Sequence, residues 1–155
     1  GLDSVGQRLV LARKFGADET IDVTAMADDA LVGHVRDLCP TEGADIAMEV
    51  CGIASVVPLG IRMLRTGGRY VIAGLVNPGS DFKLDGNEIL RKWITLKGIP
   101  NYPPRHLVQA LDFVMANRDR FPFADIVDSK FSLEEIGEAF AKADDRSVLR
   151  AAIIP

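Results

Sequence analysis

The stretch Ala44–Gly74 decides the fold, because ADIAMEVCGIASVVPLGIRMLRTGGRYVIAG has the pattern of one strand–helix–strand unit. Ile46, Met48 and Val50 alternate with small or charged residues at a period of two, which predicts a strand. The alternation breaks at Gly52, where we expect the chain to turn. This strand is the first half of the unit.

A helix and a second strand complete the unit. Apolar residues recur at i, i+4 and i+7 from Val57, and Ser55 precedes them as a candidate N-cap. We predict a helix here that Gly67–Gly68 end. Residues 69–73 are rich in β-branched and aromatic side chains and form the second predicted strand.

The two strands define a candidate binding edge. Parallel strands joined by a helix place their carboxyl ends at one edge of the sheet, and ligands of such sheets bind there. We therefore predict that Val50–Gly52 and Ala73–Leu75 lie side by side at a ligand site.

Further strands and helices extend this alternation. We predict strands at Leu2–Asp3, Glu19–Val23 and Ile94–Gly98, with helices before or after each. The first helix has capping-box spacing between Ser4 and Gln7. Strand and helix alternate along the chain, which predicts an α/β fold with a doubly wound parallel sheet.

The composition is that of a soluble globular protein. The 155 residues are 48% hydrophobic and 26% charged, with a net charge of -4. The acidic balance argues against a nucleic-acid or membrane-surface binder, which needs a cationic surface. No apolar run reaches about 18 residues, so we expect no membrane span. Cys39 and Cys51 form no CxxC pair, which is typical of a reducing compartment, and we predict a cytoplasmic protein.

Asp3 and Arg150 each allow two interpretations. Asp3 ends a strand and precedes a helix, so it either favours the helix N-terminus or accepts the ribose hydroxyls of a dinucleotide. Arg150 interrupts the apolar strand predicted at Val148–Ile154. Its charge needs either water or an anion such as a phosphate.

The last third of the chain changes character. It contains two predicted helices, Arg105–Asn117 and one that begins after a capping box at Ser132 and Glu135. The residues expected to face the core are Leu107, Leu111 and Val114 in the first helix and Ile136, Phe140 and Ala143 in the second.

Five pieces of the sequence occur in a recognisable order. They are GLD (1–3) with RLVLARKFGADETIDV (8–23), GADIAMEVCG (43–52), LRTGGRYVIAGL (64–75), ITLKGI (94–99), and FSLEEIGEAF (131–140) with VLRAAII (148–154). Together they resemble the medium-chain dehydrogenase family, in its zinc-containing alcohol dehydrogenase branch. NYPPRHLVQALDFV (101–114) with RFPFADIV (120–127) is similar to a subgroup proposed, by association, to accompany phosphonate catabolism.

The resemblance implies a Rossmann-type cofactor domain that lacks its first strand over residues 1–100. Residues 101–155 would be a C-terminal segment of the catalytic domain. In the family, the Cys and His zinc ligands, the first Rossmann strand and the GxGxxG turn precede the point that corresponds to Gly1. We therefore expect the C-terminal portion of a longer enzyme, with no catalytic or metal-ligating residue of its own and no activity in isolation. The strands that flank the missing one would have unpaired edges.

The resemblance also implies NAD as the cofactor. Asp3 would bind the adenosine ribose and oppose the extra phosphate of NADP, and Arg8 would cover that ribose. The other implied contacts are Val50, Cys51 and Gly52 at the adenosine, Ala73, Gly74 and Leu75 at the nicotinamide, the backbone of Ala73, Ile99 and Asn101 at its carboxamide, and Arg150 at the pyrophosphate.

The implied activity is hydride transfer between a small alcohol or carbonyl compound and the nicotinamide, in a homodimer or tetramer. Zinc would be held by ligands outside this chain. Two alternatives stay open. One is a non-catalytic nucleotide-binding or interaction module. The other is a zinc-free, NADP-linked quinone or enoyl reductase, which would be expected to replace Asp3 with a smaller or basic residue.

Overall fold

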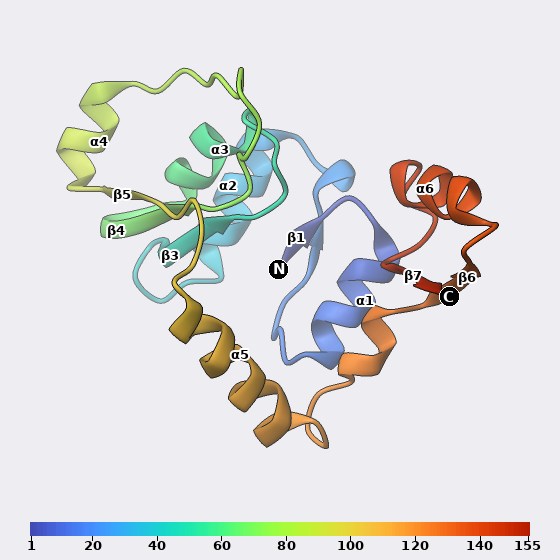
Figure 1. The fold of residues 1–155 in the computed structure, drawn as a ribbon. Coiled ribbons are helices and arrows are strands. Elements are labelled where there is room, and N and C mark those ends of the chain that lie inside the picture. Colours follow the sequence, from blue (N-terminus) through green and yellow to red (C-terminus); the bar gives the residue numbers. More distant parts are fainter. The chain divides into compact units, whose positions relative to one another are not determined.

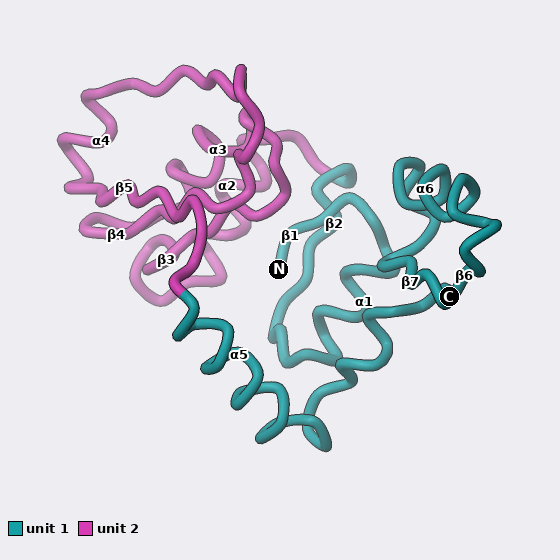
Figure 2. Tube along the Cα trace, in the orientation of Figure 1, with its two compact units in different colours: residues 1–25, 104–155 teal, residues 26–103 magenta.

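The computed structural model describes residues 1–155, which form two compact units (Figure 1 and Figure 2). The continuous unit is Met26–Pro103. The two-segment unit joins Gly1–Ala25 to Pro104–Pro155. Both strands of every hydrogen-bonded pair lie in the same unit, so no sheet extends from one unit to the other.

The continuous unit contains the predicted strand–helix–strand segment. β3 (Ala44–Glu49), α3 (Val56–Met63) and β4 (Leu64–Ile72) follow one another, and β5 (Thr95–Gly98) joins the same sheet. All strand pairs are parallel, in the order β3–β4–β5, which confirms the predicted α/β class. The other helices of this unit are α2 (Asp28–Asp37) and α4 (Gly86–Lys92).

Helix α3 ends earlier than the sequence predicts. Leu64 already has an extended backbone (φ -72°, ψ 147°), so the helix stops before Gly67 rather than at it. The register of β3 against β4 shifts between the pairs Ala44 with Leu64 and Ile46 with Arg69, and the glycines lie at this irregularity. They therefore permit a bulge in the sheet and do not end the helix.

The core of the continuous unit lies between α3 and one face of the sheet. Its buried residues are Val57, Ile61, Leu64, Tyr70 and Ile94. The opposite face is open at β3, where Ile46 is 52% and Met48 58% exposed. The period-two pattern thus predicted the strand correctly, but these apolar side chains face solvent.

The two-segment unit contains two small parallel sheets. β1 (Leu2–Asp3) pairs with β2 (Ile21–Asp22), and β6 (Ser129–Ser132) pairs with β7 (Ala151–Ile154). The helices are α1 (Gly6–Lys14), α5 (Pro104–Asn117) and α6 (Ile136–Asp144), with 3-10 helices at Val23–Ala25 and Phe123–Ile126. Four aromatic rings pack α1 against the end of α5: Phe15, Phe113, Phe121 and Phe123.

Three expectations for the last third of the chain are wrong. On α5 the predicted inward residues Leu107 and Leu111 are 60% and 61% exposed, because only the Phe113 side of the helix meets the aromatic cluster. On α6 the small Ala139 is buried and Phe140 is exposed. Arg150 precedes β7 and is exposed, so it does not interrupt the strand.

None of these helices combines the length and the apolar composition that crossing a membrane requires.

Candidate functional site

The carboxyl ends of β3, β4 and β5 lie at one edge of their sheet, as the sequence predicts. Glu49 pairs with Ile72, and Ile72 pairs with Gly98, so three loops begin side by side. The predicted contact residues in these loops are Val50, Cys51 and Gly52 after β3, Ala73, Gly74 and Leu75 after β4, and Ile99 and Asn101 after β5.

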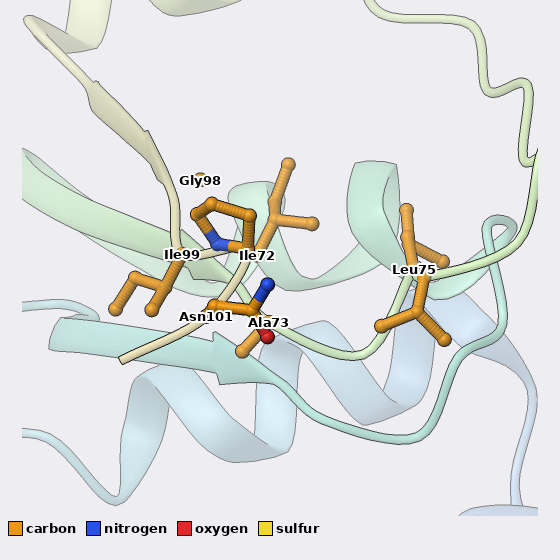
Figure 3. A pocket seen from close by; sticks show the side chains of 8 residues that line it. Ile72, Ala73, Leu75, Gly98, Ile99 and Asn101 are labelled. Carbon is orange, nitrogen blue, oxygen red and sulfur yellow. The ribbon is translucent and has the colours of Figure 1, made fainter. Parts of the chain in front are cut away.

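A cavity of about 580 Å³ opens at the ends of β4 and β5 (Figure 3). Its volume falls in the range of small-molecule sites, roughly 300–1,000 Å³. Four of the predicted contact residues line it together: Ala73, Leu75, Ile99 and Asn101. The remaining lining residues are Ile72, Val76, Gly98 and Pro100. The lining side chains are therefore apolar except for one carboxamide, and the backbone supplies the other polar groups of the wall.

Some backbone groups at this cavity have no partner in the chain. The N–H of Ile99 donates to the Ile72 carbonyl at 2.9 Å, and the N–H of Ala73 donates to the Glu49 carbonyl at 2.9 Å. The carbonyl oxygens of Ala73 and Ile99 and the N–H of Asn101 form no such bond. Ile99 and Asn101 are exposed, so water can bind these groups, and a ligand with an amide-like set of donors and acceptors could replace that water.

The residues after β3 do not line the cavity. Val50 is 69% exposed, and Cys51 is an exposed free cysteine. Gly52 instead approaches the backbone of Gly74, and a Cβ on Gly52 would lie 3.1 Å from the Gly74 carbonyl oxygen. With a φ of 76°, Gly52 also has a backbone conformation that other residues rarely adopt. The structure thus joins the first two loops through their glycines and leaves Val50 and Cys51 open to solvent.

Sequence reasoning missed the role of Glu49, the last residue of β3. Its side chain is only 2% exposed. Oε1 accepts a hydrogen bond from the N–H of Gly52 at 2.6 Å, and Oε2 accepts one from the N–H of Gly74 at 3.1 Å. The available signal was a carboxylate at the end of a predicted strand, just before a loop with a glycine.

Glu49 also influences its buried neighbour in β4. Burial, with a smaller contribution from the Glu49 carboxylate, raises the pKa of Tyr70 to about 12. Tyr70 is therefore neutral at physiological pH and acts as a core residue beneath the binding edge.

In the two-segment unit, Asp3 forms the turn that precedes α1. Its Oδ1 accepts a hydrogen bond from the N–H of Val5 at 2.9 Å, and its Oδ2 lies 3.9 Å from Nη1 of Arg8. The predicted capping box of Ser4 and Gln7 is not formed, because α1 begins at Gly6 and its N-cap residue is Val5, which makes no side-chain capping hydrogen bond. Asp3 thus lies in the turn before α1 and not in the first turn of the helix. The contact of Asp3 and Arg8 with a ribose stays a prediction.

Arg150 lies in an exposed turn of the same unit. Its backbone N–H donates to Oδ1 of Asp128 at 3.2 Å, and the N–H of Leu149 donates to both carboxylate oxygens of Asp128 at 3.0 Å. The hydrogen bond from the backbone N–H of Leu149, and to a smaller extent that from Arg150, holds the pKa of Asp128 below its usual range. The guanidinium of Arg150 forms no ion pair, so its contact with a pyrophosphate stays a prediction.

The side chains of this chain do not form a metal site by themselves. No group of three or more His, Cys, Asp and Glu residues lies close enough together to hold a metal ion. Both cysteines, Cys39 and Cys51, are free. The residues present therefore do not fit a zinc ion, and we assign no step of a reaction to one here.

Comparison with known proteins identifies the family. Residues 1–116 match the family model described as zinc-binding dehydrogenase. Because the match covers well over half of the chain, this chain belongs to the zinc-binding dehydrogenase family.

Two relatives are dehydrogenases. The 5-exo-hydroxycamphor dehydrogenase of Pseudomonas putida is 29% identical over 132 residues, which are 85% of this chain and 37% of that protein. The L-threonine 3-dehydrogenase of Colwellia psychrerythraea is 36% identical over 92 residues, which are 59% of this chain and 26% of that protein.

A solved structure shows the same fold. The alcohol dehydrogenase from Thermotoga maritima matches 99% of this chain with a TM-score of 0.90 and 24% identity. The match covers 42% of the Thermotoga chain. The predicted Rossmann-type α/β fold is thereby confirmed, and the chain spans less than half the length of each of these proteins.

Proposed function

We propose that this chain is the cofactor-binding portion of a zinc-dependent, NAD-linked alcohol dehydrogenase. Residues 1–100 would bind the cofactor, and residues 101–155 would complete the catalytic domain. The substrate would be a small alcohol or the corresponding carbonyl compound, as the names of the two dehydrogenase relatives suggest. The whole enzyme would be a homodimer or tetramer.

The observation that carries the proposal is the cavity with its unpaired backbone groups. A nicotinamide ring is flat and largely apolar, which suits the wall of Ile72, Leu75 and Ile99. Its carboxamide has two N–H donors and one carbonyl acceptor. The carbonyl oxygens of Ala73 and Ile99 would accept hydrogen bonds from the two N–H groups of the carboxamide. The N–H of Asn101 would donate to the carboxamide oxygen. When bound, the nicotinamide would supply the hydride acceptor of the reaction.

The charge of Asp3 supports NAD over NADP. A carboxylate near the adenosine ribose can accept hydrogen bonds from both ribose hydroxyls but repels a 2′-phosphate. Asp3 has one oxygen without a hydrogen bond and a side chain that is 30% exposed. The positive charges of Arg8 and Arg150 would compensate the anionic part of the cofactor.

Calorimetric titration of the purified chain with NAD and NADP tests the proposal. We expect NAD to bind with a millimolar or tighter dissociation constant and NADP to bind more weakly. The variant Asp3→Ala should weaken NAD binding and remove the preference over NADP. Asp18→Ala removes an acid from the loop after α1 and should bind NAD like the wild type. If NADP binds as tightly as NAD, or if Asp3→Ala binds NAD like the wild type, the proposed NAD-linked function is wrong.

A further inference from the structure

Glu49 is the only charged side chain that is buried in this chain, and it lies at the proposed cofactor site. It forms no ion pair with any cation. A buried carboxylate without a cation is costly unless hydrogen-bond donors surround it. Here the donors come from the backbone of two different loops, so the carboxylate and the loops depend on one another.

The contacts of Glu49 connect the loop after β3 to the loop after β4. Its side chain binds the N–H of Gly52 at 2.6 Å and that of Gly74 at 3.1 Å. Its backbone carbonyl accepts from the N–H of Ala73 at 2.9 Å and from that of Gly74 at 3.1 Å. One residue of the rigid strand β3 thus fixes three amides of the two loops.

The neighbouring glycines leave no room for a larger side chain at Gly74. A Cβ on Gly74 would overlap the Glu49 carboxylate itself, and it would lie 2.6 Å from the backbone nitrogen of Gly52. The two loops therefore pack backbone against backbone with the carboxylate between them. A loop held this closely keeps the carbonyl of Ala73 at the wall of the cavity.

We propose that Glu49 is a positioning residue for the nicotinamide end of the cofactor. By holding Gly52 and Gly74 on its two carboxylate oxygens, it keeps the loop Ala73–Leu75 in the conformation that receives the nicotinamide. Glu49 does not touch the cofactor and does not react. This inference rests on the proposed function, because it assumes that the cavity binds a nicotinamide.

The substitution Glu49→Gln isolates this role. Glutamine keeps the size and shape of the side chain, but its NH₂ group must face one of the two N–H donors, where it cannot accept a hydrogen bond. One of the two side-chain hydrogen bonds is then lost, while the bonds from Ala73 and Gly74 to the backbone carbonyl of Glu49 remain. Glu134→Gln is the matched control, because Glu134 is exposed and makes no hydrogen bond or ion pair of its own.

The first measurement uses the chain without ligand. Amide hydrogen exchange by NMR should show faster exchange at Gly52 or Gly74 in Glu49→Gln, by about tenfold or more for one lost hydrogen bond to a charged group. Exchange at the core residues Ile61 and Leu64 should not change. If both glycine amides exchange as in the wild type, Glu49 does not hold the loops and the inference is wrong.

The second measurement compares NAD with ADP-ribose, which lacks the nicotinamide. We expect Glu49→Gln to weaken NAD binding about tenfold and to change ADP-ribose binding much less, whereas general damage to the fold would weaken both equally. Equal losses, or no loss for NAD, would overturn the inference while the proposed function stands. If the wild type binds ADP-ribose but gains nothing from the nicotinamide, the proposed nicotinamide site fails and the inference fails with it.

A second variant covers the case that Glu49→Gln does not fold. Glu49→Asp keeps the charge but is one methylene shorter, so it can reach only one loop. It should show the same selective loss of NAD affinity over ADP-ribose. Retention of the wild-type ratio of the two affinities in Glu49→Asp would contradict the positioning role.

Discussion

At the scale of single residues, Gly74 is the position of the site that tolerates least change. It has an ordinary backbone conformation, so its requirement for glycine comes from space alone. A Cβ there would meet the Glu49 carboxylate and would lie 2.6 Å from the carbonyl carbon of Val50. The contacting atoms of Val50 and Gly52 are backbone atoms, so something must shift to admit the Cβ.

We expect Gly74→Ala to destabilise the chain by about 1–3 kcal/mol, the usual cost of overpacking a filled site. It should also displace the Glu49 carboxylate and reduce NAD binding. The control is Gly86→Ala at the start of α4, where nothing lies within 4 Å of the added Cβ. That variant should be neutral or slightly stabilising. Urea unfolding of both variants measures the difference, and equal stability would contradict the packing described here.

Asp128 provides a residue-scale prediction for pH. The N–H of Leu149 favours its charged form and lowers its pKa in the folded chain. The carboxylate therefore contributes stability that is present above the unfolded pKa, near 3.8, and is lost as the pH falls through the lower folded pKa. The free energy of unfolding of Asp128→Asn, followed by urea titration, should depend less on pH below pH 4 than that of the wild type. Parallel curves for the two proteins would exclude this contribution.

At the scale of elements, α3 and α5 show what a periodic pattern can and cannot predict. Both helices were predicted from apolar residues at helical spacing, and both exist. The pattern identified the buried face of α3 correctly. On α5 the same pattern lies on an exposed face, because hydrophobic spacing shows which residues share a side of a helix but not whether anything covers it.

This difference predicts opposite results for two similar substitutions. Ile61→Ala removes a fully buried side chain of α3 and should cost about 2–5 kcal/mol. Leu111→Ala removes a side chain of α5 that is 61% exposed, and alanine is a better helix former, so its effect should stay within about 0.5 kcal/mol. Chemical denaturation of the two variants tests this. A large loss for Leu111→Ala would mean that α5 is covered in solution.

The candidate site was predictable where backbone topology alone decides it. Ala73 and Leu75 were identified because residues after parallel strands meet at one edge of the sheet, whereas Ile99 was identified from the family resemblance. All three line one cavity. Glu49 was not identified, because its role depends on two loop amides that turn toward its side chain. Likewise, the spacing of Ser4 and Gln7 predicted a capping box, but α1 has no side-chain cap, and Asp3 accepts a hydrogen bond from the N–H of Val5 in the preceding turn.

At the scale of the whole molecule, the chain combines the proposed cofactor site with side chains that form no metal-binding cluster. We therefore expect no NAD reduction with primary or secondary alcohols, with or without added zinc, even where NAD binds. Formation of NADH is followed by its absorbance, and a zinc alcohol dehydrogenase serves as the positive control. Turnover by this chain alone would show that its residues contain catalytic machinery that the proposal does not include.

The unequal sizes of the sheets determine how the native chain opens. β1 and β2 share two residue pairs and α1 buries no side chain, whereas β4 is paired on both sides by β3 and β5. Segments with few buried contacts undergo local unfolding at low free energy. The amide of Ile21, which donates to the Gly1 carbonyl, should thus exchange much faster than that of Val71 in β4. If Ile21 exchanges faster in this way, Asp3 is ordered for only part of the time, and an adenosine ligand that contacts Asp3 would bind more weakly by the free energy needed to order this segment.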